Sequence, residues 1–340
     1  MRVDLINLEL QELEEFICGI GEKKYRAKQV FEWVHKGVCD FDDMTNLSLS
    51  LRDKLKEVAT VCKEDIVEKL ESKIDDTVKY LLRLPDGNVV ESVLMKYKHG
   101  YSVCVSSQVG CRMGCRFCAS TGIGFVRNLT AGEILAEVLT IQKDLGERIS
   151  NIVMMGIGEP FDNYDNVLKF LRLVNDKNGL NVGSRHISIS TCGIVPKILD
   201  FAKKNLQVTL SVSLHSADDR VRESMMPINK KYKIKELIDA CKEYINMTNR
   251  RLTFEYALVR EVNDSDEDAI DLVRLVKGMM CHINLIPVNE HEGSSYRKSY
   301  DERVERFKNI LLKKGVNATV RRELGSDIKA ACGQLRRSKL

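Results

Sequence analysis

Long apolar runs are absent from this 340-residue sequence. No stretch approaches the roughly 18–20 consecutive apolar residues of a membrane-spanning helix. The N-terminal stretch MRVDLINLELQELEEF alternates charges with leucines and lacks the continuous apolar segment of a signal peptide. Proline is scarce, at five residues, and low-complexity tracts are absent. We therefore expect a cytoplasmic protein with no membrane partner, and its length predicts one large domain with a smaller one.

A strong excess of one charge is also absent. The 53 basic and 49 acidic residues leave a net charge of +4, which is too weak to demand a nucleic-acid partner. The basic residues nevertheless form groups at Lys23–Lys28, ahead of the only tryptophan, at Asn229–Lys235 and in the last twenty residues. Each group alone is typical of a solvated surface. Basic groups with interleaved aromatics also bind phosphates and stack on bases, so they are candidate RNA contacts.

Cysteine is plentiful, at eleven residues. An odd number without a secretory signal favours reduced thiols over a disulfide framework. The cysteines are therefore better explained by chemistry than by cross-linking.

Hydrophobic periodicity changes twice along the chain. Residues 1 to about 60 carry apolar positions at helical spacing, including Val30, Phe31 and Val34. Residues 65–100 have strand character on either side of a turn at Pro85–Asn88. Thereafter strand and helix patterns alternate. Strands are expected at 101–107, 151–156, 186–191, 208–214, 252–259, 282–288 and 317–322, and helices near Thr130, which opens a capping box, Asp165, Lys233, Ser265 and Asp301.

This alternation predicts an α/β protein with a parallel sheet and helical crossovers. An open doubly wound sheet and a full or partial (β/α) barrel both fit it. In either architecture the carboxyl ends of the strands gather functional residues. Polar or glycine-rich segments follow five of the expected strands, at Cys111, Gly156–Glu159, Ser190–Gly193, Ser213–Ser216 and Pro287–Asn289. We expect these segments to form one site.

The segment CRMGCRFCAS places Cys111, Cys115 and Cys118 in the order C-x3-C-x2-C. A structural zinc site that uses Cys104 as its fourth ligand is one interpretation. Zinc sites, however, typically use two separated pairs of ligands, whereas three cysteines within eight residues suit an iron–sulfur cube. Three protein ligands on four irons leave one iron open, and an open metal position is typical of a catalytic site.

The three-cysteine loop after the first strand of a β/α alternation resembles that of the radical S-adenosylmethionine (radical SAM) superfamily. In that superfamily the open iron of a 4Fe-4S cluster chelates S-adenosylmethionine, and its reductive cleavage yields a 5′-deoxyadenosyl radical. Gly158-Glu159-Pro160 is similar to the superfamily motif that receives the ligand's ammonium group. The resemblance implies a partial (β/α) barrel.

A closer resemblance is to the RlmN-type methyltransferases, which methylate C2 of adenine in 23S rRNA and tRNA. It rests on ESVLM, VCVSSQVGCRMGCRFCAS, RNLTAGEI, GIGEP, ISTCGIVP, SLHS, MPINKKY, NLIPVN and DIKAACGQLR, which occur in family order over roughly 70% of the chain. This resemblance implies a helical accessory domain at 1–62, a β-hairpin extension at 63–100 and a catalytic domain at 101–340. It also implies two S-adenosylmethionine molecules per turnover, a one-electron donor such as flavodoxin or ferredoxin, and a monomer.

Three residues acquire roles only through this resemblance. Cys332 matches the cysteine that carries the methyl group and forms a transient thioether with RNA. Cys104 matches the cysteine that resolves this link through a disulfide with Cys332, and Glu91 matches the proton acceptor. Without the resemblance, both cysteines would be interpreted as packing residues and Glu91 as an edge charge. The implied cofactor contacts are Gly158, Glu159, Ser190, Ser213, Leu214, His215 and Asn289.

Two other functions fit parts of this pattern. The C8-directed sister enzymes, of the Cfr type, share the cluster cysteines, Cys104, Cys332 and Glu91, although ESVLM, RNLTAGEI and the GEP triplet are more similar to the C2 type. A non-catalytic, zinc-stabilised RNA-binding protein would instead use all four clustered cysteines as ligands. Iron and sulfide content distinguishes this last interpretation from the other two.

Overall fold

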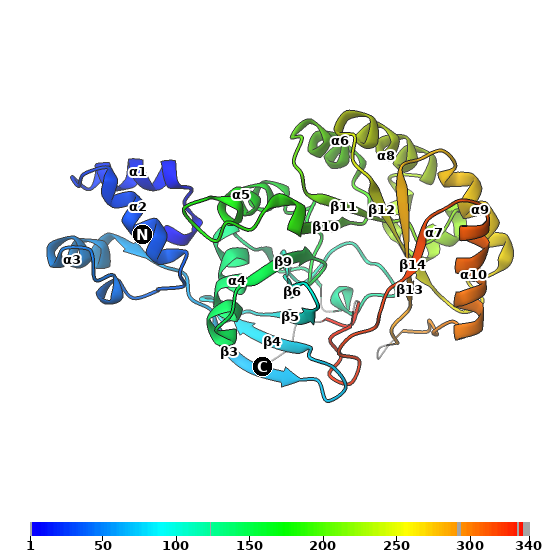
Figure 1. Cartoon of the computed structure of the whole chain (residues 1–340), viewed down its shortest axis with the longest axis horizontal. Helices are drawn as coiled ribbons and strands as arrows, with labels where there is room; N and C mark the ends of the chain where they lie inside the picture. The colour runs from blue at the N-terminus through cyan, green and yellow to red at the C-terminus, as the bar shows by residue number, and fades with distance from the viewer. Residues whose placement is uncertain (1, 123, 291–293, 332, 336–340) are drawn as a thin grey trace.

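A ten-stranded sheet organises this protein (Figure 1). The structure is a computed structural model that describes residues 2–122, 124–290, 294–331 and 333–335. Within these residues the strand order is β14-β13-β12-β11-β10-β9-β6-β5-β4-β3. Seven neighbouring strands, β6 and β9 to β14, run parallel.

The parallel strands match those expected from the sequence to within a few residues. They are β6 (Gly100–Cys104), β9 (Ile149–Met154), β10 (Ile187–Thr191), β11 (Thr209–Ser213), β12 (Leu252–Leu258), β13 (Cys281–Pro287) and β14 (Ala318–Val320). Neighbouring parallel strands in the sheet are also consecutive in the sequence of these seven strands, so the strand order runs in one direction across the sheet and never reverses. This excludes the doubly wound sheet, whose order reverses at a switch point. The partial barrel is confirmed.

Among the residues that the structure describes, a helix follows each parallel strand except the last. These helices are α4 (Ala131–Leu145), α5 (Tyr164–Asn175), α6 (Val195–Lys203), α7 (Asp219–Met225), α8 (Ile234–Thr248), α9 (Asp266–Val276) and α10 (Asp301–Lys313). The five helices expected from the sequence are confirmed, whereas α6 and α7 were not predicted because they are short. The helices in the described part of the chain are too short or too polar to cross a membrane.

An antiparallel extension widens the sheet beyond β6. It consists of β3 (Asp65–Glu71), β4 (Val78–Arg83) and β5 (Val89–Tyr97). The predicted turn at Pro85–Asn88 joins β4 to β5, with Gly87 at φ +82°. This positive φ suits glycine, which has no Cβ to clash.

The N-terminal unit contains α1 (Leu10–Gly19), α2 (Tyr25–Val34) and α3 (Leu49–Val58). As predicted, Val30, Phe31 and Val34 are buried. A short parallel pair, β1 (Val3–Asp4) with β2 (Ala59–Thr60), closes the unit by joining its two ends. The unit lies beside α4 and α5, at the end of the molecule opposite to α9 and α10 (Figure 1).

Candidate active site

The three-cysteine loop begins after β6 and is closed at its neck by a short antiparallel pair. This pair consists of β7 (Gln108–Val109) and β8 (Arg127–Asn128). Gly110 has φ +74°, and a Cβ there would lie 1.7 Å from the carbonyl oxygen of Gly124. Within the loop, the hydroxyl of Thr121 donates to the carbonyl oxygens of Cys115, at 3.1 Å, and Cys118, at 2.9 Å. The loop is thus tied at its neck and between its last two cysteines.

Cys111, Cys115 and Cys118 line one cavity at the carboxyl ends of the parallel strands. Burial raises the pKa of the Cys111 thiol to about 12, and it raises the pKa of Cys115 well above the ordinary value of 9.0. Such thiols become thiolates only when a strong positive charge binds them. The donor set therefore fits a cationic iron–sulfur group, in keeping with the superfamily.

The spacing of these sulfurs bears on the zinc interpretation. In the described part of the chain, no three His, Cys, Asp or Glu side chains lie close enough together to hold a single metal ion. A zinc site would need its thiolates around one ion, whereas the thiolates of a cube bind separate corners. Cys104 is not among the residues that line the three-cysteine cavity. Cys104 lines a different cavity from the three cysteines that the zinc interpretation would combine it with.

Gln108 and Glu159 connect the cysteine loop to the ends of β9 and β10. The Glu159 carboxylate accepts from the Thr191 hydroxyl at 2.6 Å, the Cys192 N–H at 2.7 Å and the Phe161 N–H at 3.0 Å. The Gln108 side chain accepts from the Glu159 N–H at 2.9 Å. Burial raises the pKa of Glu159 from 4.5. Its carboxylate is thus largely used by the protein, which limits what it can offer to the expected ammonium group.

Most of the expected cofactor contacts line the same cavity. Gly158, Glu159, Ser190, Ser213, His215 and Asn289 are part of its lining. Leu214 is not: it is fully buried, and its carbonyl oxygen accepts from Arg222 Nε at 3.1 Å. The strand-end segments therefore converge as the parallel topology predicts.

His215 is held as a neutral imidazole. Its Nδ1 accepts a hydrogen bond from the Ala257 N–H at 2.8 Å, which leaves Nε2 as the protonated nitrogen. Burial, aided by the charge of Arg222, lowers the pKa of His215 to about 3. Phe117 packs edge-on against its ring, with the centroids 4.7 Å apart. His215 can therefore offer this cavity a neutral N–H donor.

Arg222 on α7 is a buried charge that sequence reasoning missed. Its guanidinium donates to the carbonyl oxygens of Cys192 at 2.9 Å, Ser213 at 3.1 Å and Leu214 at 3.1 Å, and to Asn229 Oδ1 at 2.9 Å. It is fully buried. Arginine on a short helix rich in charges is typical of an exposed residue, so no local signal distinguishes it. Arg222 joins the ends of β10 and β11 beside the cavity.

A second cavity lies beside the first and contains Cys104. The two cavities share Met155, Ile286, Asn289 and Arg321 in their linings. Cys332 lies outside the described residues, but Ala330, Ala331 and Leu335 on either side of it line the second cavity with Cys104. The structure thus brings the described neighbours of Cys332 to Cys104.

Glu91 is buried on β5 and is not among the residues that line either cavity. Its Oε1 lies 3.8 Å from Nζ of Lys79 on β4. The Lys79 ammonium also donates to the carbonyl oxygen of Lys329 at 3.4 Å. Lys79 therefore links Glu91 to the segment that precedes Cys332.

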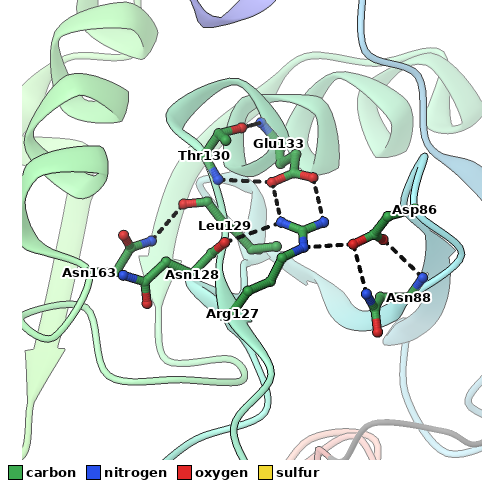
Figure 2. Close-up of polar contacts among 8 residues, drawn as sticks. All are labelled: Asp86, Asn88, Arg127, Asn128, Leu129, Thr130, Glu133 and Asn163. Atoms are coloured by element: carbon green, nitrogen blue, oxygen red, sulfur yellow. Dashed lines mark hydrogen bonds and ion pairs between the residues drawn. The ribbon is translucent and has the colours of Figure 1, made fainter.

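Arg127 fixes the exit of the cysteine loop (Figure 2). Its guanidinium binds both carboxylate oxygens of Glu133 at 2.8 Å, and its Nε donates to Asp86 at 2.7 Å. Glu133 also completes the predicted capping box with Thr130, which is confirmed. Asp86 belongs to the β4–β5 turn, so this one side chain connects the loop exit, α4 and the antiparallel extension.

Comparisons with known proteins agree with this architecture. A family model described as the radical SAM superfamily matches residues 105–273. A second model, the ribosomal RNA large subunit methyltransferase N-terminal domain, matches residues 3–61. A solved radical SAM methyltransferase from Sphaerobacter thermophilus is 44% identical, with a TM-score of 0.94 over 98% of this chain and 99% of that one. The fold and the cysteine loop therefore define a radical SAM enzyme.

Sequence relatives narrow the class. A protein from Clostridium novyi named as a probable dual-specificity RNA methyltransferase RlmN is 56% identical over 98% of both chains. One of the same name from Alkaliphilus oremlandii is 55% identical over 100% of this chain and 99% of its own. The chain belongs to the RlmN family of radical SAM RNA methyltransferases. Membership implies a 4Fe-4S cluster and S-adenosylmethionine as cofactors.

Proposed function

We propose that this protein methylates C2 of a specific adenine in 23S rRNA and in tRNA, and its relatives' names, which describe dual-specificity RNA methyltransferases, support two RNA substrates. The observation that carries the proposal is the pair of adjoining cavities. One holds the three cysteines and the strand-end residues, and the other holds Cys104 with the described neighbours of Cys332. The methyl-carrying cysteine and the target base must both lie close to S-adenosylmethionine, and two adjoining cavities allow this.

The cofactors and the chain divide the chemistry. When bound by Cys111, Cys115 and Cys118, the cluster supplies the electron that cleaves S-adenosylmethionine, which allows methylation of an electron-poor ring carbon that lacks nucleophilic character. Gly158, Glu159, Ser190, Ser213, Leu214, His215 and Asn289 are the proposed S-adenosylmethionine contacts. Three of them, Glu159, Leu214 and His215, are buried, and the other four are partly exposed.

Three further residues handle the methyl group. In this proposal Cys332 takes a methyl group from one S-adenosylmethionine, and a second molecule provides the hydrogen abstraction that joins this carbon to adenine C2. Glu91 or Cys104 removes the C2 proton. The Cys104 thiolate would then attack the Cys332 sulfur, so that the disulfide bond forms as the sulfur–carbon bond to the RNA breaks. The released carbon would take up a proton to become the methyl group, and the remaining unpaired electron would return to the one-electron carrier. The burial of Cys104 beside Ala330 and Ala331 supports this pairing.

The remaining functional assignments are also proposals. The basic groups at Lys23–Lys28, at Asn229–Lys235 and beyond Cys332 are proposed to contact the RNA backbone, with the target base splayed out. Residues 1–62 would act as an accessory domain, 63–100 as the hairpin extension and 101–340 as the catalytic domain. A flavodoxin or ferredoxin would supply electrons to a cytoplasmic monomer.

One experiment tests the reaction. The protein, purified without oxygen and with its iron and sulfide measured, is incubated with S-adenosylmethionine, reductant and unmodified 23S rRNA or tRNA. Mass spectrometry of digested nucleosides should detect 2-methyladenosine. Detection of 8-methyladenosine instead would favour the C8-directed reaction, and stoichiometric zinc without iron would contradict the enzymatic proposal.

A further inference from the structure

The segment 324–335, which we call the C-terminal loop, carries Cys332 and contacts two distant parts of the chain. It follows β14 and runs back toward β4 (Figure 1). Asp327, Gly325 and Lys329 meet the antiparallel extension, whereas Gly333 and Leu335 meet the cysteine loop. The described residues on both sides of position 332 are therefore anchored.

The first anchor is the turn between β3 and β4. Asp327 accepts two hydrogen bonds there, from the Ser72 hydroxyl and from the Lys73 N–H, both at 2.8 Å. Asp75 in the same turn accepts from the Gly325 N–H at 3.0 Å. The turn thus donates to a carboxylate of the C-terminal loop, and the loop donates to a carboxylate of the turn. Such charge-assisted hydrogen bonds are stronger than neutral ones.

This turn is braced before the C-terminal loop reaches it. The Ser72 hydroxyl accepts from the N–H groups of Ile74 and Asp75, both at 3.2 Å, and Asp75 also accepts from the Thr77 N–H at 2.9 Å. The backbone of Ser72 donates to the Thr77 carbonyl oxygen at 2.9 Å. A turn held internally presents its donors at little additional ordering cost.

Close packing supports the same contact. Gly325 has φ +61°, and a Cβ there would lie 2.8 Å from both Thr77 Cγ2 and Ala330 Cβ. The Ala330 N–H donates to the Gly325 carbonyl oxygen at 2.9 Å, so 325–330 forms a tight turn. The Lys73 and Ser72 donors also hold the pKa of Asp327 below its ordinary value of 3.8.

The second anchor lies beside the cluster cysteines. The N–H of Ala119, the residue after Cys118, donates to the Gly333 carbonyl oxygen at 2.8 Å. The hydroxyl of Ser120 donates to the Leu335 carbonyl oxygen at 2.7 Å. This anchor couples the C-terminal loop to the loop that holds the cluster.

We propose that Asp327 is a positioning residue that, through Ser72 and Lys73, docks the C-terminal loop onto the β3–β4 turn and so holds the described neighbours of Cys332 at the second cavity. The inference rests on the proposed function, in which Cys332 carries the methyl group. Asp327 is exposed and is not among the residues that line either cavity, so its effect acts through the position of the loop. The β3–β4 turn would thereby have a role in coupling radical generation to methyl transfer.

The test compares Asp327→Ala with Asp76→Ala, an exposed acidic residue of the same turn, in the full-length protein. Without any cofactor, hydrogen exchange followed by mass spectrometry should show faster exchange, by roughly tenfold, in peptides covering Lys73 and the C-terminal loop of Asp327→Ala. Asp76→Ala should exchange as the wild-type protein does. Equal exchange in all three proteins would overturn the anchor, whether or not the wild-type protein methylates RNA.

With the cluster loaded, the ratio of methylated RNA to 5′-deoxyadenosine formed reports the coupling. We expect Asp327→Ala to lower this ratio several-fold with unchanged S-adenosylmethionine affinity, and Asp327→Asn to lie between it and the wild type. Ser72→Ala should also lower the ratio, because it removes one of the two donors to Asp327 together with the acceptor that braces the turn. An unchanged ratio in Asp327→Ala would overturn the proposal.

Discussion

Lys79 and Glu91 form a buried ion pair across β4 and β5, with 3.8 Å between Nζ and Oε1 and side-chain exposures of 8% and 3%. Lys79 is paired in register with Val93 and Glu91 with Leu81, so the two charges are diagonal neighbours on one face of the sheet. This face meets the C-terminal loop through the Lys329 carbonyl oxygen. Lys79 therefore connects Glu91, the proposed proton acceptor, to the loop that carries Cys332, the proposed methyl carrier.

Breaking this pair should cost more than replacing it. Lys79→Met removes one charge from a site shielded from water, and we expect a loss of about 3 kcal/mol in the free energy of unfolding. Lys79→Met combined with Glu91→Leu should recover most of that loss, because neither charge is then buried. Urea denaturation followed by circular dichroism measures both. If the double variant were no more stable than Lys79→Met, the unpaired Glu91 charge would not be the cause of the lost stability.

Arg222→Lys should damage both stability and cofactor binding. A lysine ammonium has three donors and cannot reproduce the planar fork that reaches the carbonyl oxygens of Cys192, Ser213 and Leu214. Leaving a buried acceptor unpaired costs about 1–3 kcal/mol, and we expect a loss in this range. Equilibrium binding should show weaker S-adenosylmethionine affinity. Arg220→Lys, on the exposed side of the same helix, is the control and should change neither quantity.

Arg127→Lys should loosen the exit of the cysteine loop. Lysine cannot bind both oxygens of Glu133 while reaching Asp86, so we expect a loss of about 1–2 kcal/mol by urea denaturation. Arg26→Lys, at a site with a single side-chain acceptor in Gln29, is the matched control and should lose less. Equal losses in the two variants would mean that the bidentate contact adds nothing.

Acid should weaken the fold through His35. This histidine is 4% exposed, and neither ring nitrogen has a hydrogen-bond partner in the described part of the chain. Burial lowers its pKa from 6.5 to about 4. Between these values the unfolded chain binds the proton more strongly, so stability is present above pH 6.5 and is lost as the pH falls toward 4, by about 3 kcal/mol.

His35→Phe keeps the ring stacked on Phe31 and removes this titration. The variant should therefore lose less stability than the wild type between pH 6.5 and pH 4, measured as the urea midpoint at each pH. His99→Phe, at an exposed position, should retain the wild-type dependence. If the urea midpoints of His35→Phe and the wild type fell in parallel with pH, His35 would not be the group that weakens the fold in acid.

Cys104→Ala should trap the protein on RNA if Cys104 resolves the proposed thioether. Removal of a small buried side chain is compatible with folding, while the link to RNA would lose its nucleophile. A denaturing gel with labelled RNA should show a slower, protease-sensitive species that is absent from the Cys332→Ala variant. The absence of any such species would count against a resolving cysteine.

Local pattern was sufficient for much of the fold and part of the site. Strand and helix periodicities located the parallel strands and five of their helices, because alternating burial leaves its period in the sequence. The position of Cys111 and of the strand-end segments then followed, because parallel strands end at one edge of a sheet. Helices α6 and α7 were not predicted because they are too short to show a clear helical period.

The sequence by itself was enough to indicate a radical SAM enzyme, through the spacing of the three cysteines, the alternation of strands and helices, and the order of the motifs. Only the tertiary structure decided that Arg222 is buried, that Leu214 lies outside the cavity lining and that Glu159 is occupied by Thr191 and Cys192. It alone joined Asp327 to Ser72, across 255 residues. The physical reason is that periodicity records which side of an element faces the core, whereas contacts between distant segments depend on how whole elements pack.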